Sequence, residues 1–303
     1  MVFHEVTGRG WVGVGDWQST AGTSGEVAIV TDSAASLSPA QAAEYGIAIV
    51  PIRIQFGTES YRDGIDITRE AFYDRLTARA PHPTTSLPPP SDFMDVYRSL
   101  ATRAKSVISI HVMGSASGTV QAARMGAAML PEQDITVFDS MSASMGQGFL
   151  ALLAARLARL GRTKAEILAA LERARKKVDI YGAIASLDYV LRGGRVQRGA
   201  ALLSSVLKIH PVVRLHDGVV EVADIVRTFP RAVERVTRLA QQSVGTRPVH
   251  LAVLHANVPQ QAEELLRKIQ ASFNCVEALV ADVGVAIAIH GGPGVLAVAT
   301  MEE

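Results

Sequence analysis

Short apolar runs alternate with amphipathic helical patterns through the first half of this 303-residue chain. Strand-like runs at 27–31, 107–112 and 135–139 are separated by helical periodicity, which is clear at 91–104 and 143–161. Parallel strands need long crossover connections, which are usually helices, and the helices then bury both faces of the sheet. We therefore expect an N-terminal α/β domain with a mainly parallel sheet sandwiched by helices.

The second half of the chain adds an antiparallel signal. The runs 209–215 and 219–226 flank His216, Asp217 and Gly218, and an Asp-Gly pair is a common hairpin turn. Helices at 230–240 and 259–273 alternate with further strand-like runs. This pattern predicts a C-terminal α/β domain with a mixed sheet.

The predicted organisation is a flexible N-terminal extension at 1–25, an N-terminal domain at 26–165 and a C-terminal domain at 166–303. The extension is rich in Gly, Ser and Thr and has no apolar core of a signal peptide. It contains Gly8-x-Gly10-x-x-Gly13, which matches the dinucleotide fingerprint in spacing. No strand pattern precedes this match and no helix pattern follows it, so it does not predict a nucleotide site.

Composition excludes several partners. The chain is 48% hydrophobic and 19% charged with a net charge of +1, which is typical of a globular protein and not of a nucleic-acid binder. Its basic run at 173–177 falls on a helical pattern and is interpreted as a solvated face. The longest apolar helical stretch, 149–160, is far shorter than the ~20 residues of a membrane span. A single cysteine, Cys275, excludes an internal disulfide, and we expect a cytoplasmic protein.

Hydroxyl-rich segments stand where strands end or helices begin. Thr31-Asp32-Ser33 follows the first strand, and Thr84, Thr85 and Ser86 stand before three prolines that restrict the backbone. The segment 114–119, GSASGT, joins a strand to a helix, and a helix N-terminus attracts anions. In open α/β sheets, ligands bind at the carboxyl ends of strands. The alternative is that Ser115 or Ser117 merely caps the helix.

Two glycine-rich segments of the second half carry basic side chains, Arg195 in 192–195 and His290 in 289–294. Glycine pairs permit a positive φ and leave a neighbouring side chain projecting from a loop. Other chemistry is excluded by motif: there is no GxxxxGK[ST] for ATP and no HExxH for a metal. The segment GSASG has Ala116 where a nucleophile elbow requires Ser.

Seven short motifs occur in one order along the chain: TDS at 31–33, YRDGIDIT at 61–68, PTTSLP at 83–88, SGT at 117–119, DSMSAS at 139–144, GGR at 193–195 and HGGPG at 290–294. This order resembles the DegV family, which includes the fatty-acid-binding subunits of bacterial fatty acid kinase. The resemblance runs from Val27 to Thr300. The family often has GTHTGPG where this chain reads AIHGGPG, so two threonine donors are absent around His290.

The resemblance implies a two-domain α/β fold that buries one long-chain fatty acid between the domains. It implies no metal, no other cofactor and no catalytic residue. By motif position the carboxylate is bound by Thr85 and Ser117, with Arg195 and His290 close by. Ser86, Gly118 and Thr119 are neighbours with backbone donors, and Arg227 is a second cation for an acyl phosphate.

Family members present the bound acid to a separate ATP-dependent kinase subunit, whose acyl-phosphate product enters phospholipid synthesis. The absence of an ATP-binding motif agrees with a kinase activity on a separate subunit. The resemblance also allows transient contact of the protein with a membrane. Two alternatives stay open. One is a carrier or sensor of fatty acid without a kinase partner. The other is a serine esterase that uses Ser117, His290 and an aspartate such as Asp32.

Overall fold

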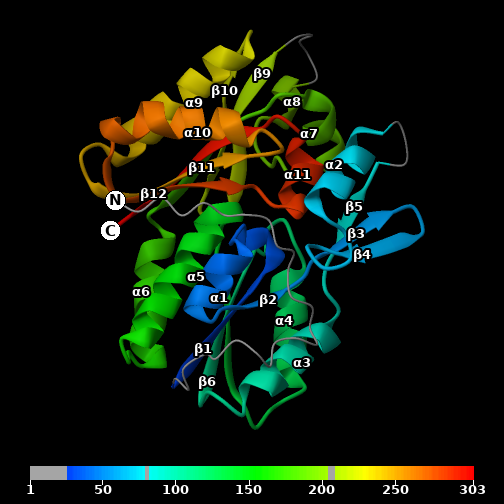
Figure 1. The fold of residues 1–303 in the computed structure, drawn as a ribbon, viewed down its shortest axis with the longest axis vertical. Coiled ribbons are helices and arrows are strands. Elements are labelled where there is room, and N and C mark those ends of the chain that lie inside the picture. The colour runs from blue at the N-terminus through cyan, green and yellow to red at the C-terminus, as the bar shows by residue number, and fades with distance from the viewer. Residues whose placement is uncertain (1–25, 79–81, 204–208) are drawn as a thin grey trace.

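Four parallel strands form the first sheet in the computed structural model, which describes residues 26–78, 82–203 and 209–303. Their order across the sheet is β2 (Ala48–Val50), β1 (Val27–Asp32), β6 (Ser106–His111) and β7 (Asp134–Asp139). The predicted extension at 1–25 and its glycine motif lie outside the described residues. This sheet occupies the lower half of the molecule in Figure 1.

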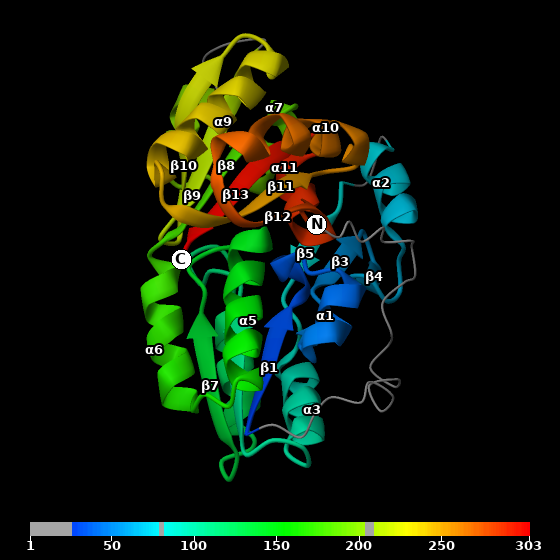
Figure 2. The ribbon, with the colours of Figure 1, turned by 60° about the vertical axis from the view of Figure 1, so that its left-hand side comes forward.

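Helices cover both faces of this sheet. On one face, Val30, Val50 and Val107 pack against the helices α3 (Pro90–Leu100) and α4 (Thr119–Ala128). On the other face, Ile29, Ile108 and Ile110 belong to a core shared with the helices α1 (Pro39–Tyr45), α5 (Ser144–Arg159) and α6 (Lys164–Arg175). Figure 2 shows α5 and α6 side by side in front of β1 and β7. The predicted parallel sheet between helices is confirmed.

The second sheet has six strands and mixed pairing, as predicted. Their order is β10 (Val219–Val226), β9 (His210–His216), β8 (Val178–Ala183), β13 (Leu296–Glu302), β11 (Pro248–His255) and β12 (Asn274–Asp282). The β11–β12 pair is parallel and the other pairs are antiparallel. Asp217 and Gly218, with φ of 45° and 74°, form the predicted hairpin turn.

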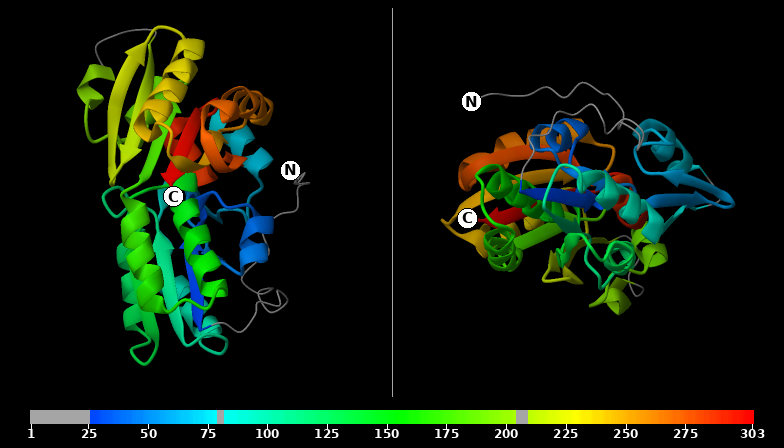
Figure 3. Two further views of the ribbon diagram at one scale, coloured as in Figure 1. Left: turned by 90° about the vertical axis from the view of Figure 1, so that its left-hand side faces the viewer. Right: turned by 90° about the horizontal axis from the view of Figure 1, so that it is seen from below.

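The helices α9 (Phe229–Val244) and α10 (Pro259–Ile269), with the short turn η2 (Gln270–Ser272), cover one face of this second sheet. The opposite face turns toward the first sheet, so that the two halves stack end to end in Figure 3. Three shorter helices complete this half: α7 (Leu187–Gly193), α8 (Ala200–Leu203) and α11 (Val285–Gly291). No helix within the described ranges is long and apolar enough to cross a membrane.

A third, small sheet was not predicted. It contains β4 (Glu59–Arg62), β3 (Arg53–Phe56) and β5 (Thr84–Ser86), and α2 (Arg69–Thr77) lies between β4 and β5 in the chain. Pro51 stands between β2, which belongs to the first sheet, and β3, which belongs to the third. The hydroxyl segment before the prolines is therefore the strand β5 and not a loop. Its backbone is held by hydrogen bonds to β3.

Local signals fix several helix ends. Thr163 and Glu166 form a capping box at the start of α6, and Gly161, with φ of 73°, follows the end of α5. Helix α6 ends at Arg175, and Val178 begins the strand β8. The proposed domain limit at 165/166 falls inside α6, which packs against α5.

Asp32 ties the carboxyl ends of β1 and β6 together. One carboxylate oxygen accepts from the backbone N–H of Ala34 at 3.0 Å. The other accepts from the backbone N–H of Val112 at 3.0 Å and lies 2.9 Å from His111 Nδ1. All of these groups are buried, so the carboxylate satisfies donors that have no access to water.

The network continues through the interior of the first half. The Ser109 hydroxyl lies 2.6 Å from His111 Nε2 and accepts from the Tyr97 hydroxyl at 2.9 Å. With the imidazole proton on Nδ1, donation runs from Tyr97 through Ser109 and His111 to Asp32, and every group is satisfied. The connectivity is that of a Ser-His-Asp triad, but Ser109 is completely buried and is not among the residues that line the cavity between the two halves. The network therefore has a structural role.

An Asp32→Ala variant is expected to lose about 3 kcal/mol or more of unfolding free energy, because three buried donors lose their acceptor at about 1–3 kcal/mol each. Urea denaturation measures the loss. Asp134→Ala is the control, since Asp134 makes an exposed ion pair with Lys164 and such pairs contribute about 1 kcal/mol or less. Equal losses in both variants would contradict the structural role of Asp32.

Candidate ligand-binding site

A cavity of about 470 Å³ lies between the two halves of the molecule. From the first half it is lined by residues just beyond the carboxyl ends of β1, β6 and β7, namely Ala34, Val112, Met113 and Ala143. The inner face of the second sheet contributes an apolar surface made by Ile180, Gly182, Ile184, Val213, Leu215, Val220 and Ala297. The position agrees with the rule that ligands bind beyond the carboxyl ends of parallel strands.

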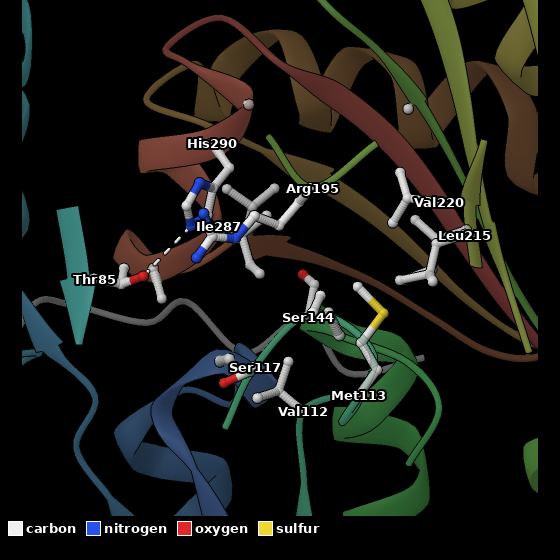
Figure 4. A pocket seen from close by; sticks show the side chains of 18 of the residues that line it. Thr85, Val112, Met113, Ser117, Ser144, Arg195, Leu215, Val220, Ile287 and His290 are labelled. Atoms are coloured by element: carbon white, nitrogen blue, oxygen red, sulfur yellow. Dashed lines mark hydrogen bonds between the residues drawn. The ribbon is translucent and has the colours of Figure 1, made fainter. Parts of the chain in front are cut away.

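Polar side chains gather at one end of the cavity. Thr85, Ser117, Arg195 and His290 all line it, although they come from four separate parts of the chain. In Figure 4 the side chains of Thr85, Arg195 and His290 converge, while Leu215 and Val220 lie at the other end. Ser86, Gly118 and Thr119 also line the cavity. The structure thus brings together seven of the eight residues that the sequence indicated.

The hydroxyl groups differ in how they are bonded. Thr85 Oγ1 lies 3.5 Å from His290 Nε2, a long contact that leaves both atoms available to a ligand. The Ser86 hydroxyl accepts from the Gln55 side chain at 3.1 Å. The hydroxyls of Ser117 and Thr119 are 2.8 Å apart, so they can orient each other toward one acceptor. Thr85 and Ser117 are therefore the hydroxyls best placed to donate into the cavity.

Helix capping does not account for the SGT segment. Gly118 occupies the N-cap of α4 and provides no side chain, and Ser115 instead donates to the backbone carbonyl of Gly218 at 2.6 Å. Ser117 accepts from the Thr119 N–H at 3.3 Å, which leaves its own proton free to be donated. The N-terminus of the ten-residue helix α4 adds its partial positive charge at this end of the cavity.

His290 is neutral at physiological pH. Desolvation by burial, the positive charge of Arg195 and the neighbouring His82 together lower the pKa of its imidazole to about 4, and burial has the largest effect. Its Nδ1 atom is buried and has no hydrogen-bond partner among the described residues. Arg195, which donates to the Gly193 carbonyl at 2.7 Å and keeps solvent access, is thus the permanent cation of this end.

The glycines of the segments 192–195 and 289–294 allow close packing of helices as well as turns. His290 belongs to α11 and not to a loop, and a Cβ on Gly193 of α7 would lie 2.9 Å from His290 Nδ1. Gly194, with φ of 61°, ends α7 in the left-handed conformation. A Cβ on Gly292 would lie 2.5 Å from the Tyr189 ring. These glycines let α7 and α11 approach each other, which places Arg195 beside His290.

Arg227 does not belong to this group. It is exposed and follows β10 at the end remote from the cavity, seven residues beyond Val220. A strand rises ~3.3 Å per residue, so Arg227 lies roughly 20 Å along the strand from that cavity wall. The sequence could not indicate this, because the direction of β10 relative to the cavity depends on the hairpin.

The esterase alternative fails on geometry. A triad needs the serine bonded to the histidine and the histidine bonded to the aspartate. Asp32 is instead bonded to His111, Ser117 to Thr119, and His290 contacts Thr85. Within the described ranges, no cluster of three or more His, Cys, Asp or Glu side chains is arranged to hold a metal ion.

Sequence reasoning missed most of the apolar wall. Ala286 and Ile287 of α11 face the cavity, but their helix has seven residues, too short for its periodicity to be recognised. Ser144, with φ of 49°, lines the cavity at the start of α5 and bonds Ser36 at 2.9 Å. For β8 a signal existed: Ile180, Gly182 and Ile184 alternate with residues that face α9.

The low pKa of His290 predicts how stability depends on pH. The folded protein binds fewer protons than the unfolded chain between pH 6.5 and about 4, so this residue destabilises the fold as pH falls through that window. A His290→Gln variant is expected to lose less unfolding free energy than the wild type between pH 7.5 and pH 5, measured by urea denaturation. Identical losses of unfolding free energy in the two proteins would contradict the lowered pKa of His290.

Comparison with known proteins places this architecture in a family. The model of the DegV family, described as an uncharacterised protein, matches residues 26–303. A DegV domain-containing protein of Streptomyces coelicolor is 36% identical over 275 residues, which are 90% of this chain and 97% of that protein.

Two solved structures share the fold. A fatty-acid-binding DegV family protein from Thermus thermophilus has a TM-score of 0.86 and 32% identity, covering 92% of this chain and 100% of that one. A stearic-acid-binding protein from Eubacterium ventriosum has a TM-score of 0.84 and 25% identity, covering 90% and 97%. The order of motifs, the two stacked sheets and these matches lead to one conclusion: the chain belongs to the DegV family.

Proposed function

We propose that this protein binds one long-chain fatty acid in the cavity between its two halves. The carboxylate lies at the end formed by Thr85, Ser117, Arg195 and His290, and the acyl chain extends toward Leu215 and Val220. The main support is the asymmetry of the cavity, where Thr85, Arg195 and His290 converge at one end while most of the remaining lining is apolar. The fatty acids bound by the Thermus and Eubacterium proteins support it.

The polar end suits a carboxylate. A buried carboxylate must keep several hydrogen bonds or a cationic partner to offset its desolvation. Two hydroxyls, the N-terminus of α4 and the Arg195 guanidinium supply both kinds of interaction. Neutral His290 can donate from one ring nitrogen without placing a second charge beside Arg195.

The apolar end suits an alkyl chain. Each buried methylene contributes about 0.8 kcal/mol, so about a dozen of them contribute on the order of 10 kcal/mol before the costs of association. This is enough to retain the acid through purification. A polar ligand of the same size gains little from such a wall and leaves its own groups without partners.

We further propose that the protein, in the cytoplasm, presents the bound carboxylate to a separate ATP-dependent kinase subunit for acyl-phosphate formation that feeds phospholipid synthesis. The sequence carries no motif for holding ATP itself, and Arg195 reaches the cavity from a solvent-accessible position. There it can neutralise charge that develops on the acyl phosphate. A carrier without a kinase partner is the outcome if no such subunit acts on the loaded protein.

One prediction from this proposed function concerns the binding of the carboxylate. The double variant Thr85→Val/Ser117→Ala is expected to bind palmitate at least about 100-fold more weakly, because each of the two lost hydrogen bonds to a charged group contributes about 1.5–3 kcal/mol. Binding of hexadecanol, which lacks the charge, should change much less. Isothermal titration calorimetry measures both ligands, and Thr102→Val, at an exposed hydroxyl, is the control. Equal loss for the acid and the alcohol would contradict the placement of the carboxylate.

The second prediction concerns acyl-phosphate formation. With an acid-loaded protein and its kinase subunit, Arg195→Ala should reduce the rate of hydroxamate trapping at least tenfold, and Arg195→Lys should restore part of it. Loading is measured in parallel by mass spectrometry, so that lost binding and lost turnover are separated. A fully loaded Arg195→Ala protein with the wild-type rate would refute the role of this residue.

A further inference from the structure

Strand β8 has a position without a side chain in the middle of the cavity wall. Ile180 and Gly182 of this strand, and Ile184 directly after it, line the cavity, while Tyr181 and Ala183 pack on the opposite face beneath α9. Gly182 is buried and lies between two large neighbours on its own face. A glycine inside a strand weakens the strand and often marks a close approach of another group.

Neither the backbone nor packing within the protein requires this glycine. Its φ is not among the positive values of the chain, so an L-residue is accommodated without strain. A Cβ built on Gly182 would lie 3.4 Å from Val213 Cγ2 and 3.5 Å from the Ala297 Cβ, which are ordinary contacts. By contrast, a Cβ on Gly193 would come within 2.9 Å of His290. The missing side chain at 182 therefore leaves space on the cavity side.

The adjoining strands continue this space across the sheet. Gly182 pairs with Ala297 of β13 on one side and with Val213 of β9 on the other. A glycine beside an alanine forms a shallow depression in the wall, flanked along β8 by Ile180 and Ile184. The next cavity residues along β9 and β10 are Leu215 and Val220, at the end remote from the polar groups.

Two hydrogen bonds join the halves of the molecule at the β9–β10 turn, between the strands that carry Leu215 and Val220. The Gly218 N–H in the β9–β10 turn donates to the Met141 carbonyl at 2.7 Å, and the Ser115 hydroxyl donates to the Gly218 carbonyl. In the proposed binding mode, an acyl chain that begins at Thr85 and His290 extends toward this turn. The depression at Gly182 lies in the wall that leads to it.

We propose that Gly182 is a specificity-determining residue, which sets how long an acyl chain the cavity accepts. The inference rests on the proposed function, since it assumes that a fatty acid occupies the cavity. A side chain at 182 fills the depression, so long chains lose contacts or must fold back, whereas short chains that end before it are unaffected. The carboxylate end is not touched by the change.

The test compares saturated acids of 10 to 18 carbons by calorimetry. Wild-type affinity is expected to rise about fourfold per added methylene until the cavity is full. In Gly182→Val the rise should stop at a shorter chain, with at least tenfold weaker binding of the 18-carbon acid and less than twofold change for the 10-carbon acid. Adding Val213→Ala, which removes two methyl groups beside position 182, should restore part of the loss.

Ala278→Val, which enlarges an exposed side chain of strand β12, is the matched control and should leave the series unchanged. Thermal unfolding confirms that each variant is folded. The inference would be overturned if Gly182→Val had the wild-type affinity for every acid, or if its affinity were weakened equally at every chain length. Wild-type protein that binds no acid of any length would instead overturn the proposed function, and the inference with it.

Discussion

The six-stranded sheet has the helices α9 and α10 on one face only, and its other apolar face must be covered by the N-terminal half. Hydrogen bonds fix how this is done. At one contact the Ser36 hydroxyl donates to the Val283 carbonyl at 2.7 Å, and at another the hairpin turn at Gly218 bonds Met141 and Ser115. Because the ends of the parallel strands do not fill the sheet's inner face completely, a cavity remains. The candidate site depends on this incomplete contact.

Within the N-terminal half, the buried carboxylate of Asp32 keeps the ends of β1 and β6 in register with the turn that follows β1. The residues just beyond these ends, including Ala34 and Met113, form part of the cavity wall. A group that the sequence suggested for catalysis thus shapes the site through the backbone. The charge at the polar end also depends on surrounding groups, since burial and Arg195 together lower the pKa of His290 and keep its imidazole neutral.

Much of the fold and several of the cavity residues could be predicted from the sequence. Alternating strands and helices indicated the parallel sheet, and Asp217-Gly218 indicated the hairpin. Four of the seven motifs contain the seven cavity residues, because hydroxyl, glycine and basic residues can be recognised directly in a sequence. The third sheet was missed, since its strands have three or four residues, too few for a period to be recognised. Arg227 is exposed and does not line the cavity, and the sequence alone cannot show in which direction a hairpin extends.

The glycines show the same limit in detail. The sequence shows only that residues 182 and 193 are both glycine. In the structure, Gly193 permits the helices α7 and α11 to approach, whereas Gly182 leaves space in the cavity wall. Only the contacts around each position separate the two roles.

The most direct test of the central claim is mass spectrometry of the freshly purified protein under native and then denaturing conditions. The account predicts a native mass that exceeds the chain by one fatty acid, with the acid released on denaturation. A protein that carries no acid, and acquires none after incubation with palmitate or oleate, would contradict the claim that this cavity is a fatty-acid site.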